Sequence, residues 1–169
     1  MKKKKTAQEG LKIKGMFRLH IEDDGQIVGD SGWHENRIVN LGFLNFVNLL
    51  GTGLTGSKIN AVALGTGTLL ATDATVLPGE VWATGAGSSS VIRPVVTAVA
   101  VGSTTLRNTA TFASSSSFAS STFSISNIGL WNSTGPVSTS GTIYAGNTYA
   151  SSSLATNQNV NVTYDIVFS

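Results

Sequence analysis

Every second residue of the stretch Asn159-Val160-Asn161-Val162-Thr163-Tyr164-Asp165-Ile166-Val167-Phe168, counted from Val160, is apolar. A period of two residues is that of a β-strand that buries one face, so this stretch predicts a strand. The same period recurs from Lys12 to Glu22. The Asp23-Asp24-Gly25 that follows predicts a tight hairpin turn, because glycine adopts positive φ without strain. Gln26 to Gly29 is then the expected return strand.

Short β-branched and aromatic segments, separated by Gly, Ser and Asn, continue through the chain and predict more strands. We expect these strands at Trp33 to Val39, Ile59 to Leu64, Val91 to Val101, Thr104 to Phe112, Thr122 to Trp131 and Thr142 to Ala150. There is no strand–helix–strand rhythm, which disfavours a parallel sheet. The expected fold class is therefore all-β: a mainly antiparallel, jelly-roll-like β-sandwich with one short α-helix near residues 40–50.

The segment with helical spacing runs from Asn40 to Leu50. Asn40 suits the N-cap position, and Gly51 suits the position just after the last turn. Apolar side chains recur three or four positions apart and form a stripe of Phe43, Phe46, Val47 and Leu50. We expect this stripe to pack against the sheet.

Charge is distributed very unevenly along the chain. Charged residues make up 12% of the sequence, where a typical soluble domain has about 25%. From Val81 onward the only acidic or basic side chains are Arg93, Arg107 and Asp165. A β-rich surface with so little charge is explained if copies of the chain or a larger assembly cover it, which favours a structural part over an enzyme. Glu80 lies in an apolar setting and needs a partner, which Arg93 or Arg107 could supply.

Most of the excess positive charge lies near residue 1. The run Lys2-Lys3-Lys4-Lys5 carries four positive charges, so the net charge of +2 becomes −2 without it (2 − 4). We expect residues 1–10 to be a flexible basic arm and residues 11–169 to be a single β-rich domain. A slightly acidic body disfavours a nucleic-acid partner. A membrane partner is also disfavoured, because no apolar run reaches the length that spans a bilayer.

None of the motifs that carry catalysis or cofactor binding is convincing. Gly51 to Lys58 resembles a phosphate-binding loop, but Ser57 and Lys58 stand in the wrong order and the segment follows a helix. His20 and His34 lack the neighbouring ligands that a metal site needs, and no serine lies in a nucleophile elbow. We therefore expect no enzymatic activity, no cofactor and no metal.

The basic arm and several aromatic side chains are the candidate contacts with a partner. Lys2 to Lys5 would contribute exposed ion pairs, which weaken with salt. The aromatic candidates are Trp33, Trp131, Tyr144 and Tyr149. The last three lie in expected strands, where rings usually serve as core or interface residues. Stacking of these rings on sugars is a further alternative.

A longer series of motifs resembles a known family. In chain order it comprises Trp33 to Asn40 leading into Leu41-Gly42-Phe43, the turn Ala63-Leu64-Gly65-Thr66-Gly67, then Asp73, Leu77, Gly79 and Glu80, then Ala110-Thr111-Phe112, and finally Ile125-Ser126-Asn127-Ile128-Gly129-Leu130. On these motifs, residues 15–169 resemble small structural proteins of tailed-bacteriophage virions. Tail-fibre variants often have an acidic residue where this chain has Asn127, and the difference favours a location on the head.

The resemblance implies a structural protein of the virion and no catalytic residues. We expect a capsid decoration or cement protein, assembled in the host cytoplasm, that binds the major capsid protein and stabilises the shell. The low charge of the body favours a homo-oligomer, and a homotrimer is the first choice because small β-rich virion proteins of this kind are often trimers. The alternatives are a tail fibre, baseplate or adaptor component, whose partners would be tail proteins, and a carbohydrate-binding adhesion module.

Overall fold

Strands dominate the part of the chain that the computed structural model describes, which comprises residues 10–51, 57–81, 93–116, 121–134 and 141–169. The elements in chain order are β1 (Ile13–Asp23), β2 (Gln26–Asp30), β3 (His34–Ile38), α1 (Asn40–Gly51), β4 (Ala61–Gly65), β5 (Thr97–Val101), β6 (Thr105–Phe112), the 3₁₀ helix η1 (Ser114–Ser116), β7 (Phe123–Trp131), β8 (Ile143–Leu154) and β9 (Asn159–Phe168). The prediction of a mainly β chain with one short α-helix is confirmed.

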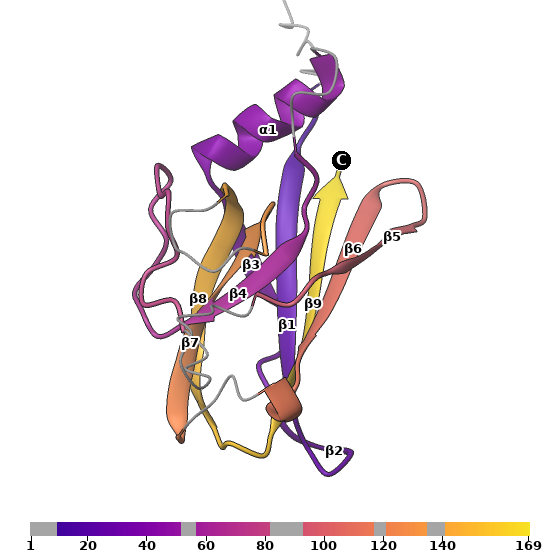
Figure 1. Cartoon of the computed structure of the whole chain (residues 1–169). Coiled ribbons are helices and arrows are strands. Elements are labelled where there is room, and N and C mark those ends of the chain that lie inside the picture. Colours follow the sequence, from indigo (N-terminus) through magenta and orange to yellow (C-terminus); the bar gives the residue numbers. More distant parts are fainter. Residues whose placement is uncertain (1–9, 52–56, 82–92, 117–120, 135–140) are drawn as a thin grey trace, which may run out of the picture.

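The nine strands form one sheet, in the order β4-β7-β8-β3-β1-β9-β6-β5, with β2 also paired to β1. Every pair is antiparallel. The sheet curls into a half-barrel (Figure 1). Its two halves are joined rather than separate, because β3 pairs with both β1 and β8. An antiparallel sheet is therefore confirmed, whereas two distinct layers are not evident.

The strands with the clearest alternation, β1 and β9, lie side by side at the centre of the sheet. They pair from Ile13–Phe168 to Glu22–Asn159, and nearly all of their inward-facing apolar positions are buried. The hairpin from β1 to β2 turns at Asp24 and Gly25, whose φ angles are 45° and 77°. Positive φ at both central residues is what a two-residue type I′ turn requires, so the predicted turn is confirmed.

The core has two parts, and β4 contributes to both because all five of its residues are buried. Val62 and Leu64 belong to the larger cluster, which includes residues of β1, β6, β7, β8 and β9. Ala61 and Ala63 belong to a smaller cluster on the other face, with Leu70, Leu77 and Trp131 among its members. The segment after β4 therefore covers an outer face of the sheet, and a continuous apolar run is the pattern expected of a strand buried on both faces.

Helix α1 lies across one end of the curled sheet (Figure 1). Gly42 sits directly against the backbone carbonyl of Tyr144 and leaves no room for a Cβ atom. The ring of Phe46 lies 6.0 Å from that of Tyr144 and 6.3 Å from that of Phe168, measured between centroids. Asn45 donates to the Ser57 carbonyl at 2.8 Å and accepts from the Ser57 N–H at 2.9 Å. These contacts define the inner face of the helix.

The predicted apolar stripe of α1 is wrong for three of its four residues. Phe43 is 44% exposed, Val47 is 62% exposed and Leu50 is 79% exposed, so Phe46 alone packs on the core. The helix is apolar around most of its circumference, so several of its faces could pack on the sheet. The face that contains Gly42 does so, because Gly42 permits close approach to the Tyr144 backbone. Most of the expected stripe consequently faces outward.

Candidate functional site

The structure places the aromatic residues proposed as partner contacts very differently from one another. Trp33 is exposed, between β2 and β3, whereas Trp131 and Tyr144 are fully buried and Tyr149 is nearly so. Burial raises the pKa of the Tyr144 phenol to about 12 and also raises the pKa of Tyr149. The expectation that these three rings contact a partner is corrected: they pack inside the protein. Lys2 to Lys5 lie outside the described residues.

Trp131 has a specific partner in the core, a buried ion pair. Arg93 Nε lies 2.7 Å from Glu80 Oε1, and Arg93 Nη2 lies 3.0 Å from Glu80 Oε2. The guanidinium carbon is 3.7 Å from the centroid of the Trp131 ring, which is the geometry of a cation–π contact. The pairing of Glu80 with Arg93 was one of the two alternatives left open by the sequence, and it is confirmed. It joins the segment after β4 to the segment before β5.

The other two charges of the second half of the chain pair with each other. Arg107 on β6 and Asp165 on β9 stand opposite one another in the sheet. Arg107 Nε donates to Asp165 Oδ1 at 2.8 Å and Nη2 donates to Oδ2 at 2.7 Å. Every acidic or basic side chain after Val81 is therefore in an ion pair, and this half of the described surface presents little free charge.

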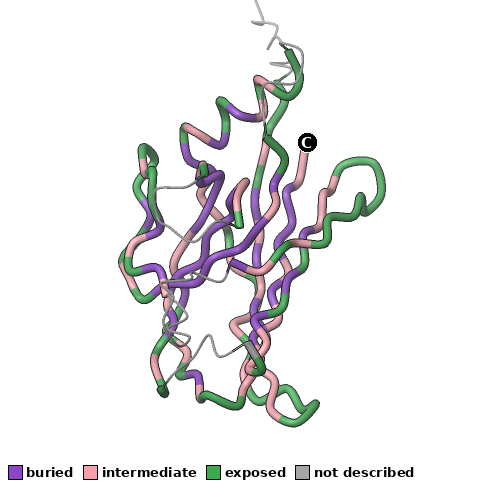
Figure 2. Tube along the Cα trace, viewed as in Figure 1, coloured by how far each residue is buried: buried purple, intermediate pink, exposed green. Residues whose placement is uncertain are grey.

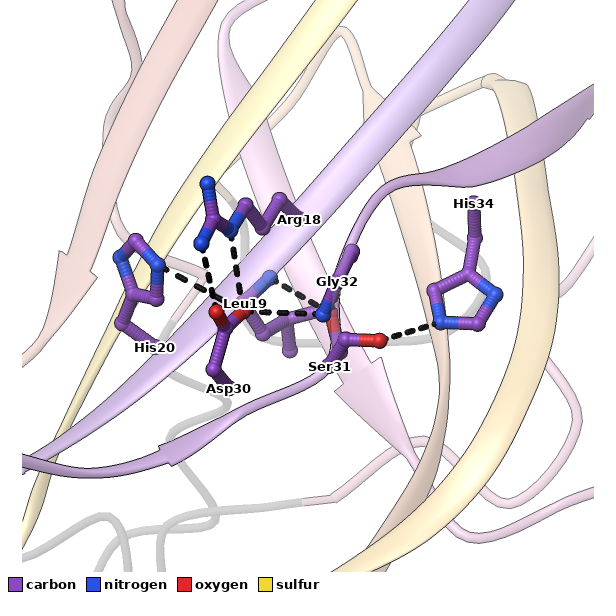
Figure 3. A network of polar contacts seen from close by, with 7 residues as sticks. All are labelled: Arg18, Leu19, His20, Asp30, Ser31, Gly32 and His34. Atoms are coloured by element: carbon purple, nitrogen blue, oxygen red, sulfur yellow. Dashed lines mark hydrogen bonds and ion pairs between the residues drawn. The ribbon is translucent and has the colours of Figure 1, made fainter.

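A second polar cluster braces the β1–β2 hairpin (Figure 3). Arg18 binds Asp30 with two hydrogen bonds, of 2.9 and 2.5 Å. This contact and the Gly32 N–H hold the pKa of the Asp30 carboxyl well below its usual range. Ser31 Oγ accepts from the Leu19 N–H at 3.0 Å and donates to the Gly32 carbonyl at 2.8 Å. These contacts fix the position of β2 against β1.

The two histidines lie beside this cluster and have different partners within it. His20 Nε2 is 3.5 Å from Asp30 Oδ1, while His34 Nε2 donates to the Ser31 carbonyl at 2.7 Å. The His34 ring stacks on Phe17 with centroids 5.5 Å apart. Within the described ranges, no three His, Cys, Asp or Glu side chains come together in a way that could hold a metal ion.

Two cavities beside α1 are small. One of about 160 Å³ lies between β1, β3 and the start of α1, and is lined by residues that include Asn36 and Phe43. Another of about 200 Å³ lies beside α1 and is lined mainly by polar residues, such as Asn45 and Asn48. Sites for small organic ligands usually enclose roughly 300–1,000 Å³, so neither cavity is a strong candidate for one.

The surface features that stand out are apolar. Strand β5 is exposed at all five positions, and Val99 is 54% exposed. The β5–β6 hairpin projects from the body, and its β5 arm and turn are coloured as exposed in Figure 2. We call Thr97–Val101 the β5 edge. Sequence analysis predicted a strand here without marking it as a contact; the available signal was the absence of charge from Val95 to Val101.

The outer side of α1 is the second apolar surface. Its exposed apolar members are Phe43, Leu44, Val47, Leu49 and Leu50, which we call the helix face. The helix has no charged residue at any of its 12 positions. Exposed helices normally carry charged side chains on their outer side, so this surface resembles one that another molecule covers. No helix among the described residues is long and apolar enough to cross a bilayer.

Comparison of the chain with models of protein families, with curated proteins and with solved structures gives no match.

Proposed function

We propose that this chain is a structural protein of a tailed-bacteriophage virion, a capsid decoration or cement protein that acts by binding its own copies and the capsid subunits beneath it. The observation that carries the proposal is the pair of charge-free apolar surfaces, the β5 edge and the helix face. The centres of protein interfaces are depleted of charge, and large exposed apolar patches mark interaction sites. Because Arg93 and Arg107 are both in ion pairs, the second half of the chain leaves the described surface nearly neutral.

A protein of this kind stabilises a shell by mass action, because each bound copy favours the assembled state over the dissociated one. In the proposed arrangement, a homotrimer covers the apolar surfaces, and Lys2 to Lys5 add salt-sensitive contacts with acidic groups of the capsid. The jelly-roll-like sandwich expected from the sequence belongs to the same proposal. The halves of the curled sheet on either side of β3 would be its two layers.

Light scattering of the purified protein over a range of concentrations tests the proposed self-association. The parent should form oligomers, and a variant with Val47→Glu and Leu50→Glu should form fewer because both changes place charge on the helix face. Ile27→Glu is the matched control, since Ile27 is equally exposed but lies on β2. A parent that stays monomeric at high concentration, and that does not bind particles stripped of it, would contradict the proposal.

The two alternatives differ in what supports them. The carbohydrate-binding alternative depended on Trp131, Tyr144 and Tyr149, and these rings are too deeply buried to stack on a sugar. A tail location remains compatible with the same surfaces. Binding assays on isolated heads and isolated tails distinguish the two locations, because a decoration protein should bind only the heads.

A further inference from the structure

Edge strands of a sheet expose unpaired backbone N–H and C=O groups, and proteins usually protect them. Two edges of this sheet are protected. The free side of β4 is bridged by Val95 and Glu80. Strand β2 follows a turn that contains Asp24, a bulge interrupts its pairing with β1, and it ends at Asp30.

In the part of the chain that the structure describes, the β5 edge has none of these protections. It pairs with β6 in a regular register from Thr97–Thr109 to Val101–Thr105, with no bulge, no proline and no charged residue. The neighbouring Arg107 does not protect it either, because its guanidinium is bound to Asp165 on the side away from β5. No described segment pairs with the free side of the β5 edge, so its backbone can accept another strand.

The sequence of the β5 edge indicates which strand would fit. Thr97-Ala98-Val99-Ala100-Val101 reads nearly the same in both directions about Val99. If two such strands pair antiparallel about Val99, each alanine faces an alanine and each Thr97 faces a Val101, which has nearly the same shape. One face of the new pair then holds only β-branched side chains, which form favourable cross-strand pairs, and the other face holds only alanines.

We infer that the β5 edge binds the β5 edge of a second copy of this chain, antiparallel and centred on Val99. The contact is self-complementary, as an interface about a two-fold axis must be. It continues the sheet from one copy into the next and buries no unpaired charge. The inference rests on the self-association proposed above and adds its location; the contact can join two copies in a dimer or link neighbouring homotrimers.

Single cysteines test this register, because the chain has none of its own. In the inferred pairing the two copies of residue 99 face each other with Cα atoms about 4.5–5.5 Å apart, within reach of a disulfide. The two copies of residue 97 are offset by four residues, about 13 Å along the strand, which is too far. Mild oxidation should therefore link Val99→Cys into dimers at least about tenfold faster than Thr97→Cys, a control at a position that is also exposed.

Two further measurements complete the test. The double variant Thr97→Cys with Val101→Cys should cross-link again, because these positions face each other in the inferred register. Val99→Lys should weaken self-association, since it places like charges opposite one another, whereas Ile27→Lys on β2 should not. Circular dichroism checks that each variant is folded.

Equal cross-linking of Val99→Cys and Thr97→Cys would overturn the inference, because it would indicate random collision. If neither variant cross-links while the parent still forms oligomers, the β5 contact is wrong and the proposed function stands. If the parent is also monomeric and does not bind capsids, both are wrong. The inference is supported only when the position-specific pattern and the loss in Val99→Lys occur together.

Discussion

Replacing Glu80 by alanine should destabilise this protein more than almost any other single change of a charged residue. Glu80 accepts two hydrogen bonds, of 2.7 and 3.0 Å, from Arg93, whose side chain is completely buried. Without Glu80 the guanidinium would remain buried on the Trp131 ring and would lose the carboxylate that balances its charge. Burying an unpaired charge is among the most costly changes in a protein interior.

The size of the effect follows from the burial of both partners. Removing one member of a buried ion pair typically costs about 3–5 kcal/mol. For a chain of this length each 1 kcal/mol lowers the melting temperature by roughly 2–4 °C, so we expect a decrease of about 6–20 °C. Urea unfolding followed by circular dichroism measures the free energy, and a thermal melt measures the temperature.

Two comparisons separate the charge effect from general damage. A double variant, Glu80→Leu with Arg93→Met, removes both charges and should recover much of the lost stability, since well-packed apolar residues can replace a buried pair at little cost. Asp30→Ala breaks a pair whose members are both about one-third exposed, so it should change the melting temperature far less. A loss below about 1 kcal/mol for Glu80→Ala, or a double variant less stable than Glu80→Ala, would refute this reasoning.

Two other predictions follow from the packing of the aromatic residues. Phe46→Ala should lower the free energy of unfolding by about 3 kcal/mol, the low end for a buried ring. Phe43→Ala should lower it clearly less, because Phe43 is 44% exposed. Equal losses in urea unfolding would contradict the assignment of the inner helix face. The pKa of Tyr144 is raised to about 12 in the folded state, against about 10 in an unfolded chain. Its contribution to stability should be complete below pH ~10 and should be lost as the pH rises from ~10 towards 12. Tyr144→Phe should therefore lose less stability at alkaline pH than the parent does. Tyrosinate absorbance that appears near pH 10 in the folded protein would contradict this.

Local patterns were sufficient to predict most of the strands and the turn between β1 and β2. The strand expected at Val91 to Val101 begins only at Thr97, and residues 91 and 92 lie outside the described residues. Alternation identified β1 and β9 because each buries one face only, and Asp24-Gly25 identified the turn because few residue pairs adopt two successive positive φ angles. The scarcity of charge after Val81 also indicated an apolar surface. These features depend on residues close together in the chain, and the sequence displays them directly.

Other features depended on contacts between distant residues. The spacing of apolar residues in α1 is compatible with several inward faces. Gly42 determines which face packs on the sheet, because it permits close approach to Tyr144. The sequence likewise left Arg93 and Arg107 as equal candidates for the partner of Glu80. The sheet register places Arg107 opposite Asp165, which leaves Arg93 as the partner of Glu80.

The sequence by itself thus determined where most of the strands and the helix lie and how little charge the second half carries. Only the tertiary structure decided that Trp131 and Tyr144 are core residues and that no described segment pairs with the free side of β5. The physical reason is that a strand's own pattern shows which of its faces is apolar. Whether its edge is paired, and what covers its faces, depends on strands and segments that the chain brings beside it from far along the sequence.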